Sequence, residues 1–159
     1  MLATHLLDRN RRYNANNSNV GGWASSALNA YLNGRLYNAL PDQMKLLIKQ
    51  VTVSSSVGQQ STEISTSECY ITVPAVIEVT NDSTLNIDPY IYEGTTISYM
   101  ISNDMRKRAY VDGNYGAYWL RSPNAGYANN YVYRVENDGS IYGFSNPSNS
   151  LGVLIEISI

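Results

Sequence analysis

Side chains that commonly perform enzyme chemistry are scarce in this chain. It has one histidine, His5, and one cysteine, Cys69. A Ser-His-Asp triad would have to use a residue near the start of the sequence, and a zinc site needs three or four Cys, His or carboxylate ligands. We therefore expect neither site, and we interpret His5 as a half-buried strand residue.

The acidic residues are scattered and mostly stand where turns are expected. Carboxylates next to Asn, Gly, Pro or Ser usually stabilise turns, and this explains Asp82, Asp88, Asp104, Asp112 and Asp138. The loops DGNYG and ENDGS offer oxygen ligands for Ca²⁺ but lack the spaced carboxylates of an EF-hand. The nucleotide-binding patterns GxxxxGK[ST] and GxGxxG are absent. We therefore predict no enzymatic activity and no cofactor.

The C-terminal third has a composition suited to binding. Half of the 14 tyrosines lie between Tyr110 and Asn149, among many Asn and Ser residues. Tyr supplies stiff contact area with a hydroxyl, while Asn and Ser supply adaptable hydrogen bonds, as in antibody paratopes. The tracts NAGYANN and SNPSNS are too long for minimal turns. We expect Tyr118 and Trp119 to be buried, and Tyr133 could be buried or exposed. The residues expected to be exposed are Tyr127, Asn129, Asn130, Tyr131 and Tyr142.

Low charge narrows the choice of partner. Charged residues make up 15% of the chain and the formal net charge is -2, whereas nucleic-acid binding depends on clustered Lys and Arg. We interpret the basic runs Arg9/Arg11/Arg12 and Arg106/Lys107/Arg108 as solvated faces or loops. No stretch has the ~20 apolar residues of a membrane span. The predicted partner is a protein or glycan ligand on a cell surface, with no nucleic acid and no membrane insertion, and the oligomeric state is open.

Two helices and several strands must position this segment. The 159 residues suit one domain, 1–159. Apolar residues at spacings of three and four after Ser25 or Ser26 predict a helix broken near Asn33-Gly34. Pro41-Asp42 begins a second helix, with Met44, Leu47 and Ile48 as its apolar stripe. Both helices should pack on one face of a sheet.

The strands are read from β-branched runs and turn signals. We expect strands at 51–53, 69–73 and 118–122, with a polar, flexible loop at 54–68 and an irregular loop at 81–96. Asn137-Asp138-Gly139 predicts a hairpin between 131–136 and 140–144. The closing run GVLIEISI suits a buried central strand, so the class is α+β. Residues 1–5 look like the end of a strand, which suggests a fragment of a longer protein that lacks an N-terminal strand.

Several segments resemble one family over essentially the whole chain. GGWASSALNAYLN, WLRSP and the closing NSLGV are similar to a domain of unknown function common in Firmicutes and their phages. That domain resembles the formylglycine-generating-enzyme type of C-type lectin fold, a mixed, mainly antiparallel sheet with two helices and long loops. The oxidase of that fold relies on active-site cysteines. Cys69 lies outside the C-terminal region where they would sit, so the resemblance does not imply that activity.

The same fold displays the variable proteins of diversity-generating retroelements, in which adenine-directed mutagenesis enriches Asn, Tyr and Ser. By this resemblance Trp119, Leu120, Arg121, Gly152 and Val153 are scaffold. Many relatives close with GVRPA where this chain has GVLIEI, and relatives without a retroelement also use the domain. The resemblance therefore allows either a surface diversified by a retroelement or a surface of fixed sequence. The ligand-binding positions implied by the resemblance are Asn124, Tyr127, Asn129, Asn130, Tyr131, Tyr133, Tyr142, Ser145, Asn146, Ser148 and Asn149.

The resulting hypothesis is a receptor- or adhesin-type binding module on a cell surface or phage tail. Its recognition surface would be the Tyr-, Asn- and Ser-rich C-terminal third, with affinity from a few Tyr anchors. Two alternatives come from other classes of protein. One is a structural or assembly domain of a surface or phage tail protein with no ligand of its own, and the other is a calcium-dependent sugar-binding lectin.

Overall fold

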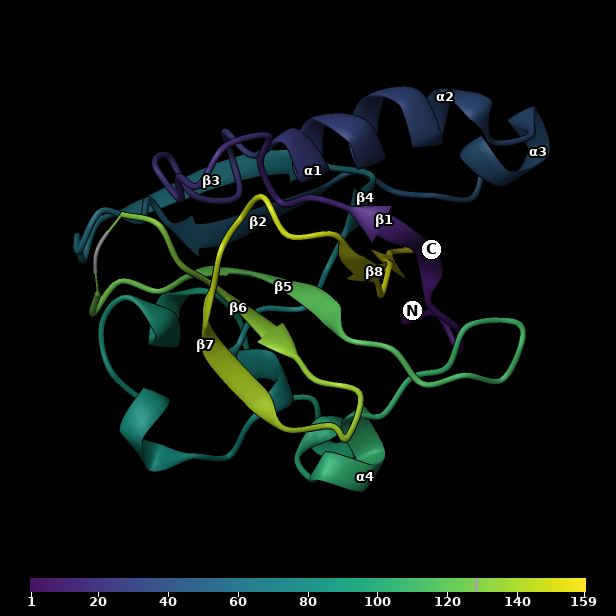
Figure 1. The fold of residues 1–159 in the computed structure, drawn as a ribbon. Coiled ribbons are helices and arrows are strands. Elements are labelled where there is room, and N and C mark those ends of the chain that lie inside the picture. Colours follow the sequence, from purple (N-terminus) through teal and green to yellow (C-terminus); the bar gives the residue numbers. More distant parts are fainter. Residues whose placement is uncertain (128) are drawn as a thin grey trace.

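The computed structural model describes residues 1–127 and 129–159 and has the expected α+β composition, with more sheet than helix (Figure 1). Its main sheet has five strands in the order β1-β8-β5-β6-β7. Neighbouring strands are antiparallel except for β5 and β8, which are parallel. The strands are β1 (Leu7–Arg11), β5 (Tyr118–Pro123), β6 (Val132–Val135), β7 (Ile141–Ser145) and β8 (Leu151–Val153).

Strands β6 and β7 confirm the predicted hairpin, because they pair antiparallel around the Asn137-Asp138-Gly139 turn. Gly139 has φ +84°, the left-handed conformation that glycine adopts without strain. The hairpin forms one edge of the main sheet, and β1 forms the other. Its turn therefore fixes where the side chains of the Tyr-rich segment lie.

The closing run of the chain is divided between two sheets, so the prediction of one central strand is wrong. Val153 ends β8, and β9 (Glu156–Ile157) then pairs with β4 (Ile71–Thr72) in a separate two-stranded sheet. The division follows from packing, since the adjacent Val153 and Leu154 are buried in different hydrophobic clusters. The amide of Ala3 donates to the Ile155 carbonyl at 2.9 Å, and Leu2 forms an isolated bridge with Glu156.

The segment predicted as a flexible loop is instead a regular hairpin. β2 (Val51–Ser56) and β3 (Ile64–Cys69) pair antiparallel from Val51 opposite Cys69 to Ser56 opposite Ile64. Thr, Val and Ile favour strands, and serine is tolerated there because both strands are partly exposed. Three consecutive residues with positive φ, Gly58 to Gln60, close the turn.

The first predicted helix is present without its predicted break. α1 (Ala27–Ala30), the π-helical η1 (Tyr31–Leu36) and α2 (Tyr37–Ala39) follow one another directly. Ser26 caps the start by accepting a hydrogen bond from the Asn29 amide at 3.0 Å. Asn33 lies in the wider π turn and accepts from the Tyr70 and Ile71 amides at 2.7 and 2.9 Å. These bonds join the helix to β4, so the turn widens where a break was expected.

The second helix is shorter than predicted, and its apolar stripe does not form. α3 spans only Asp42–Lys45, and of the predicted stripe only Ile48 is buried. Leu47 is 59% exposed and the neighbouring Leu46 is 87% exposed. Once the helix ends at Lys45, spacings of three and four no longer place these side chains on one face.

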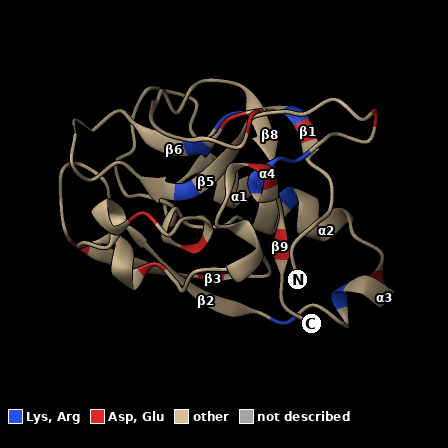
Figure 2. Ribbon diagram, turned by 90° about the horizontal axis from the view of Figure 1, so that it is seen from below, with Lys and Arg blue, Asp and Glu red and all other residues tan. Residues whose placement is uncertain are grey.

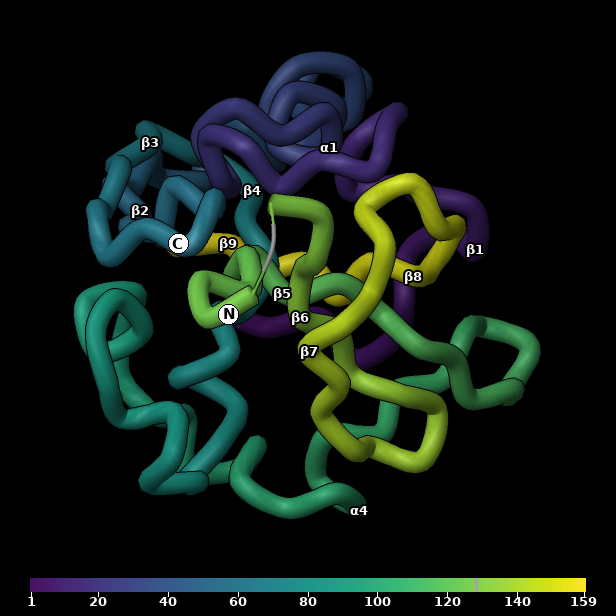
Figure 3. Tube along the Cα trace, turned by 60° about the vertical axis from the view of Figure 1, so that its left-hand side comes forward, coloured from purple at the N-terminus to yellow at the C-terminus, as the bar shows by residue number. Residues whose placement is uncertain are grey.

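An irregular segment connects β4 to β5 and covers the side of the sheet opposite α1 and α2 (Figure 1, Figure 3). The predicted irregular loop at 81–96 lies within it and is confirmed, with short 3-10 turns in place of strands. Its helical pieces are η2 (Ile77–Val79), η3 (Ser83–Leu85), η4 (Tyr90–Tyr92), η5 (Ser98–Met100) and α4 (Asn103–Arg106).

β5 separates two hydrophobic clusters. Tyr118 belongs to the one that also holds Met100 and Leu154, and Trp119 to the one that holds Trp23 and Val153. Successive strand residues point to opposite faces, and both aromatic side chains are fully buried, as predicted. No helix within the described residues is long and apolar enough to cross a membrane.

Two further expectations are wrong. His5 is exposed at a bend and its Nδ1 lies 3.0 Å from the Thr4 hydroxyl, because β1 begins only at Leu7. Arg106 is buried, although its basic run was interpreted as solvated. Its guanidinium donates to the carbonyls of Gly139 and Val79 at 2.7 and 2.8 Å, so it connects α4 to the β6–β7 turn and to η2.

Candidate functional site

A pocket of about 500 Å³ opens between the 85–90 segment and the outer strands of the main sheet. One wall comes from the β2–β3 turn and the irregular segment, the other from the chain after β5 and from the β6–β7 hairpin. The pocket thus joins segments from the middle and the end of the chain. Its lining residues are Thr62, Leu85, Ile87, Asp88, Pro89, Tyr90, Asn124, Ala125, Gly126, Tyr127, Tyr133, Gly143 and Phe144.

The outer wall is an aromatic cluster centred on Phe144. The rings of Tyr127, Tyr131 and Tyr142 pack edge-to-face around it, with centroids 4.9, 5.6 and 5.9 Å from the Phe144 centroid. Each such pair adds about 0.5–1.5 kcal/mol beyond its buried area. Tyr127 is nevertheless 57% exposed and Phe144 43% exposed. The cluster is therefore held in place while it faces solvent.

Two further tyrosines form the floor. Tyr90 and Tyr133 meet edge-to-face at 5.5 Å, and the Tyr90 hydroxyl accepts a hydrogen bond from the Ala125 amide at 2.9 Å. Burial raises the pKa of both phenols above the ordinary value. Both hydroxyls are consequently neutral at physiological pH, and the floor carries no charge.

Asn124 positions the wall. Its side-chain nitrogen donates to the Gly143 carbonyl at 2.7 Å and its side-chain oxygen accepts from the Gly126 amide at 3.0 Å. The turn after β5 is thereby attached to β7. A Cβ atom at Gly143 would lie 2.7 Å from the Tyr133 ring, so the close approach requires glycine.

The structure brings some predicted site residues together and separates others. Asn124, Tyr127 and Tyr133 line the pocket, and Tyr131 and Tyr142 contact its Phe144 wall. Asn124 is buried with both side-chain atoms engaged, so it acts by positioning. Tyr127, Asn129 and Tyr142 are exposed as expected, whereas Asn130 and Tyr131 are only half-buried.

The predicted positions from Ser145, the last residue of β7, onward are not among the described lining residues of the pocket. Ser145 is buried where β7 pairs with Val132, so its side chain does not face a ligand. The Pro147 carbonyl accepts from the Asn14 amide at 3.1 Å, and the Ser148 hydroxyl donates to Asn17. This turn, with the half-buried Asn146 and the exposed Asn149, therefore packs beside the 14–18 segment.

Phe144, Tyr90 and Ile87 were not predicted as site residues. Phe144 had a usable signal, because residues two apart on a strand share a face and Tyr142 was already a candidate. Tyr90 and Ile87 had no local signal, since their segment reaches the pocket only through the tertiary fold.

Residues 1–154 match a sequence family described as a domain of unknown function, DUF6273. The chain belongs to this family. The predicted resemblance to a domain of unknown function is thereby confirmed. No curated protein and no solved structure was found to match this DUF6273 domain.

A buried charged network lies under β5 of the DUF6273 domain. Arg121 donates to both carboxylate oxygens of Glu78 at 2.8 and 2.9 Å and to the Val73 carbonyl at 2.8 Å. Nearby, Glu93 accepts from the Ser56 amide at 2.7 Å and from the Ser122 hydroxyl. The network joins β5, β2 and the irregular segment. Among the described residues, no group of three or more His, Cys, Asp or Glu side chains could hold a metal ion.

Glu93 should make the stability of the DUF6273 domain depend on pH. Burial raises its pKa from 4.5 to about 7, so the folded state holds this proton more tightly than the unfolded state. Its contribution is fully present below about pH 4.5 and is lost as the pH rises to about 7. We expect the melting temperature to fall between pH 5 and pH 8, and to fall less in Glu93→Gln. Differential scanning calorimetry measures these melting temperatures. If the melting temperature changed equally with pH in the wild type and in Glu93→Gln, Glu93 would not be the group responsible.

Proposed function

We propose that this DUF6273 domain is a ligand-binding module of the receptor or adhesin type and not an enzyme. The observation that carries the proposal is the open pocket with Tyr127 and Phe144 in its wall. Large aromatic side chains are normally buried, and concave apolar sites with a few polar groups are where proteins hold ligands. The ligand would be a protein or a glycan on a cell surface.

We include in the proposal a C-type-lectin-like fold. The mixed sheet, in which β8 lies between β1 and β5, and the long irregular connection to β5 support it. The two chain ends also lie close together (Figure 1). Such a scaffold would present the pocket from a cell surface or a phage tail.

Diversification by a retroelement is a separate part of the proposal. It suits the exposed Tyr127, Asn129, Tyr142 and Asn149, because a change at these positions would leave the fold intact. It does not suit Asn124 or Ser145, which are buried. A surface with a fixed sequence would leave the proposed binding function unchanged.

Two alanine variants test the binding surface. We expect Tyr127→Ala and Tyr142→Ala each to weaken ligand binding by about 1 kcal/mol or more, because interface tyrosines often carry the affinity. Their melting temperatures should fall by no more than a few degrees, since each variant loses one edge-to-face contact with Phe144 and both side chains are partly exposed. Binding would be measured on arrays of glycans and bacterial surface proteins, and stability by thermal melts.

Tyr92→Ala is the matched control, because Tyr92 is as exposed as Tyr127 and lies outside the pocket lining. It should bind like the wild type. Unfolding of both test variants would show that their tyrosines belong to the core. Equal losses of ligand affinity in the two test variants and in Tyr92→Ala would show that the pocket is not the binding site.

A structural or assembly domain is the second candidate function. It is favoured by the exposed Met44, Leu46 and Leu47 at the end of α3, since apolar patches often mark contacts between proteins. This patch would then be covered by another subunit. Its distinguishing feature would be ordered packing of the Tyr- and Asn-rich loops against a neighbouring domain.

A further inference from the structure

We infer that the pocket accepts the basic side chain of a protein ligand, a lysine or an arginine. The inference rests on the proposed binding function and specifies the ligand's chemistry. It depends on three features of the pocket: its charge, its aromatic rings and its supply of hydrogen-bonding groups.

The charge of the pocket lining favours a cation. From Gln50 to Met105 the sequence contains no Lys or Arg, and the described lining includes the acidic Asp88. Thr62, Asp88 and the other residues of the first wall come from this stretch. In Figure 2 the segments that connect the short helices beside β2 and β3 carry red and no blue. The described lining residues of the second wall, which extend from Asn124 to Phe144, include no charged residue.

The nearest arginine along the chain from this second wall is already occupied. Arg134 donates to Glu136 at 2.8 Å and lies 5.0 Å from the centroid of the Tyr142 ring. An anionic ligand would therefore meet no basic side chain among the described lining residues, whereas a cation would meet the Asp88 carboxylate. Such complementarity selects the sign of a ligand's charge.

The rings suit a cation that carries an apolar stem. A cation within about 6 Å of the face of Tyr or Phe is attracted by the negative ring face. Tyr127 and Phe144 lie at 82° to each other, so their faces point in different directions. Lysine and arginine bury an aliphatic stem and keep the charge at the tip, and Leu85, Ile87 and Pro89 would contact that stem.

Two of the polar side chains in the lining are already engaged within the protein. The side chain of Asn124 is occupied on both atoms, and the Tyr90 hydroxyl accepts from Ala125. The pocket volume of about 500 Å³ lies within the roughly 300–1,000 Å³ usual for ligand sites. It exceeds the volume of one basic side chain. The remaining space would receive adjoining parts of the protein ligand.

Four small probes with a common butyl chain test the preference for charge. Butylammonium, butylguanidinium, butanol and pentanoate would each be titrated into ¹⁵N-labelled protein, with the amides of Ala125, Gly126, Tyr127 and Gly143 as reporters. We expect both cations to bind about fivefold more tightly than butanol, and pentanoate to bind most weakly. A blocked Gly-Gly-Lys-Gly-Gly peptide should bind more tightly than butylammonium, because it also fills the space beyond the side chain.

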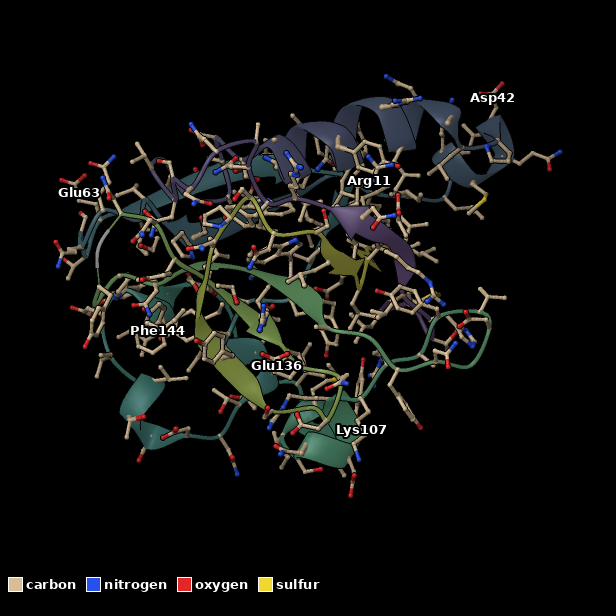
Figure 4. The ribbon with its side chains drawn as sticks, viewed as in Figure 1. Arg11, Asp42, Glu63, Lys107, Glu136 and Phe144 are labelled. Carbon is tan, nitrogen blue, oxygen red and sulfur yellow. The ribbon has the colours of Figure 1, made fainter. Side chains whose placement is uncertain are left out.

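Asp88→Asn should remove most of the preference for the cations. Asp42→Asn is the control with the same change of charge, because Asp42 lies at the end of the molecule opposite Phe144 (Figure 4). It should leave the preference unchanged. Equal affinities for butanol and butylammonium, or a preference unaffected by Asp88→Asn, would overturn the inference.

Titration with a disaccharide distinguishes failure of this inference from failure of the proposed function. If maltose or lactose shifts the same amides with equal affinity in wild type and Asp88→Asn, and the cations do not, the basic-side-chain inference is overturned and the binding function stands. If the tyrosine variants show no loss on the arrays while the cations bind the pocket as expected, the inference stands and the proposed use of the surface is overturned.

Discussion

Arg121→Met is expected to lower the free energy of unfolding by about 3–5 kcal/mol, because breaking a buried ion pair leaves the partner charge without compensation. Arg121 is 2% exposed and bonds both carboxylate oxygens of Glu78. Methionine fills a similar volume but donates nothing to Glu78 or to the Val73 carbonyl. Urea denaturation at pH 7 measures the loss.

Arg134→Met is the control for Arg121→Met. Arg134 also pairs with a glutamate, Glu136, but both side chains are partly solvated, and such pairs contribute about 1 kcal/mol or less. Adding Glu78→Leu to Arg121→Met should restore part of the lost stability, because it removes the stranded carboxylate. Similar losses in the two single variants would show that the Arg121 network contributes no more than a surface pair.

Gly139→Ala is expected to destabilise the fold by about 3 kcal/mol or more, since steric overlap and an unfavourable positive φ act together. A Cβ atom at this position would lie 1.8 Å from the Asn103 carbonyl oxygen. That oxygen belongs to α4, which Arg106 already joins to the same turn. The substitution would push the hairpin away from α4, and chemical denaturation measures the cost.

Gly113→Ala is the control that separates steric overlap from the strain of a positive φ. Gly113 has φ +86°, close to the +84° of Gly139, but a Cβ atom there would meet nothing within 4 Å. It should therefore cost only the conformational strain, about 1 kcal/mol. Equal costs at the two positions would mean that the contact with α4 relaxes without penalty.

Local patterns predicted the β6–β7 hairpin and the cap of α1, because their determinants lie within a few residues. Asn137-Asp138-Gly139 specifies its own turn, and Ser26 bonds an amide three residues away. The β2–β3 hairpin was missed because its strands are rich in serine, and a polar run without strong periodicity resembles a loop. Its pairing is visible only once both strands are present.

Part of the candidate site could likewise be predicted from local sequence, and part could not. Composition indicated the wall formed by Tyr127, Tyr131 and Tyr142. The positions of Ile87 in the opposite wall and Tyr90 in the floor depend on a path through the irregular segment that no local signal specifies. The burial of Arg106 was also invisible locally, because its carbonyl partners at Val79 and Gly139 are distant in sequence. Contacts of this range come from topology and not from residue type.

The position of β8 also determines when the chain can finish folding. Residues 151–153 lie between β1 and β5, so the first strand cannot join the sheet until one of the last has been synthesised. Such distant pairings slow folding, because a long loop must close before any contact compensates for the lost entropy. During translation, β5, β6 and β7 can associate while β1 still lacks its partner. The sheet is completed only when β8 leaves the ribosome and pairs with both β1 and β5.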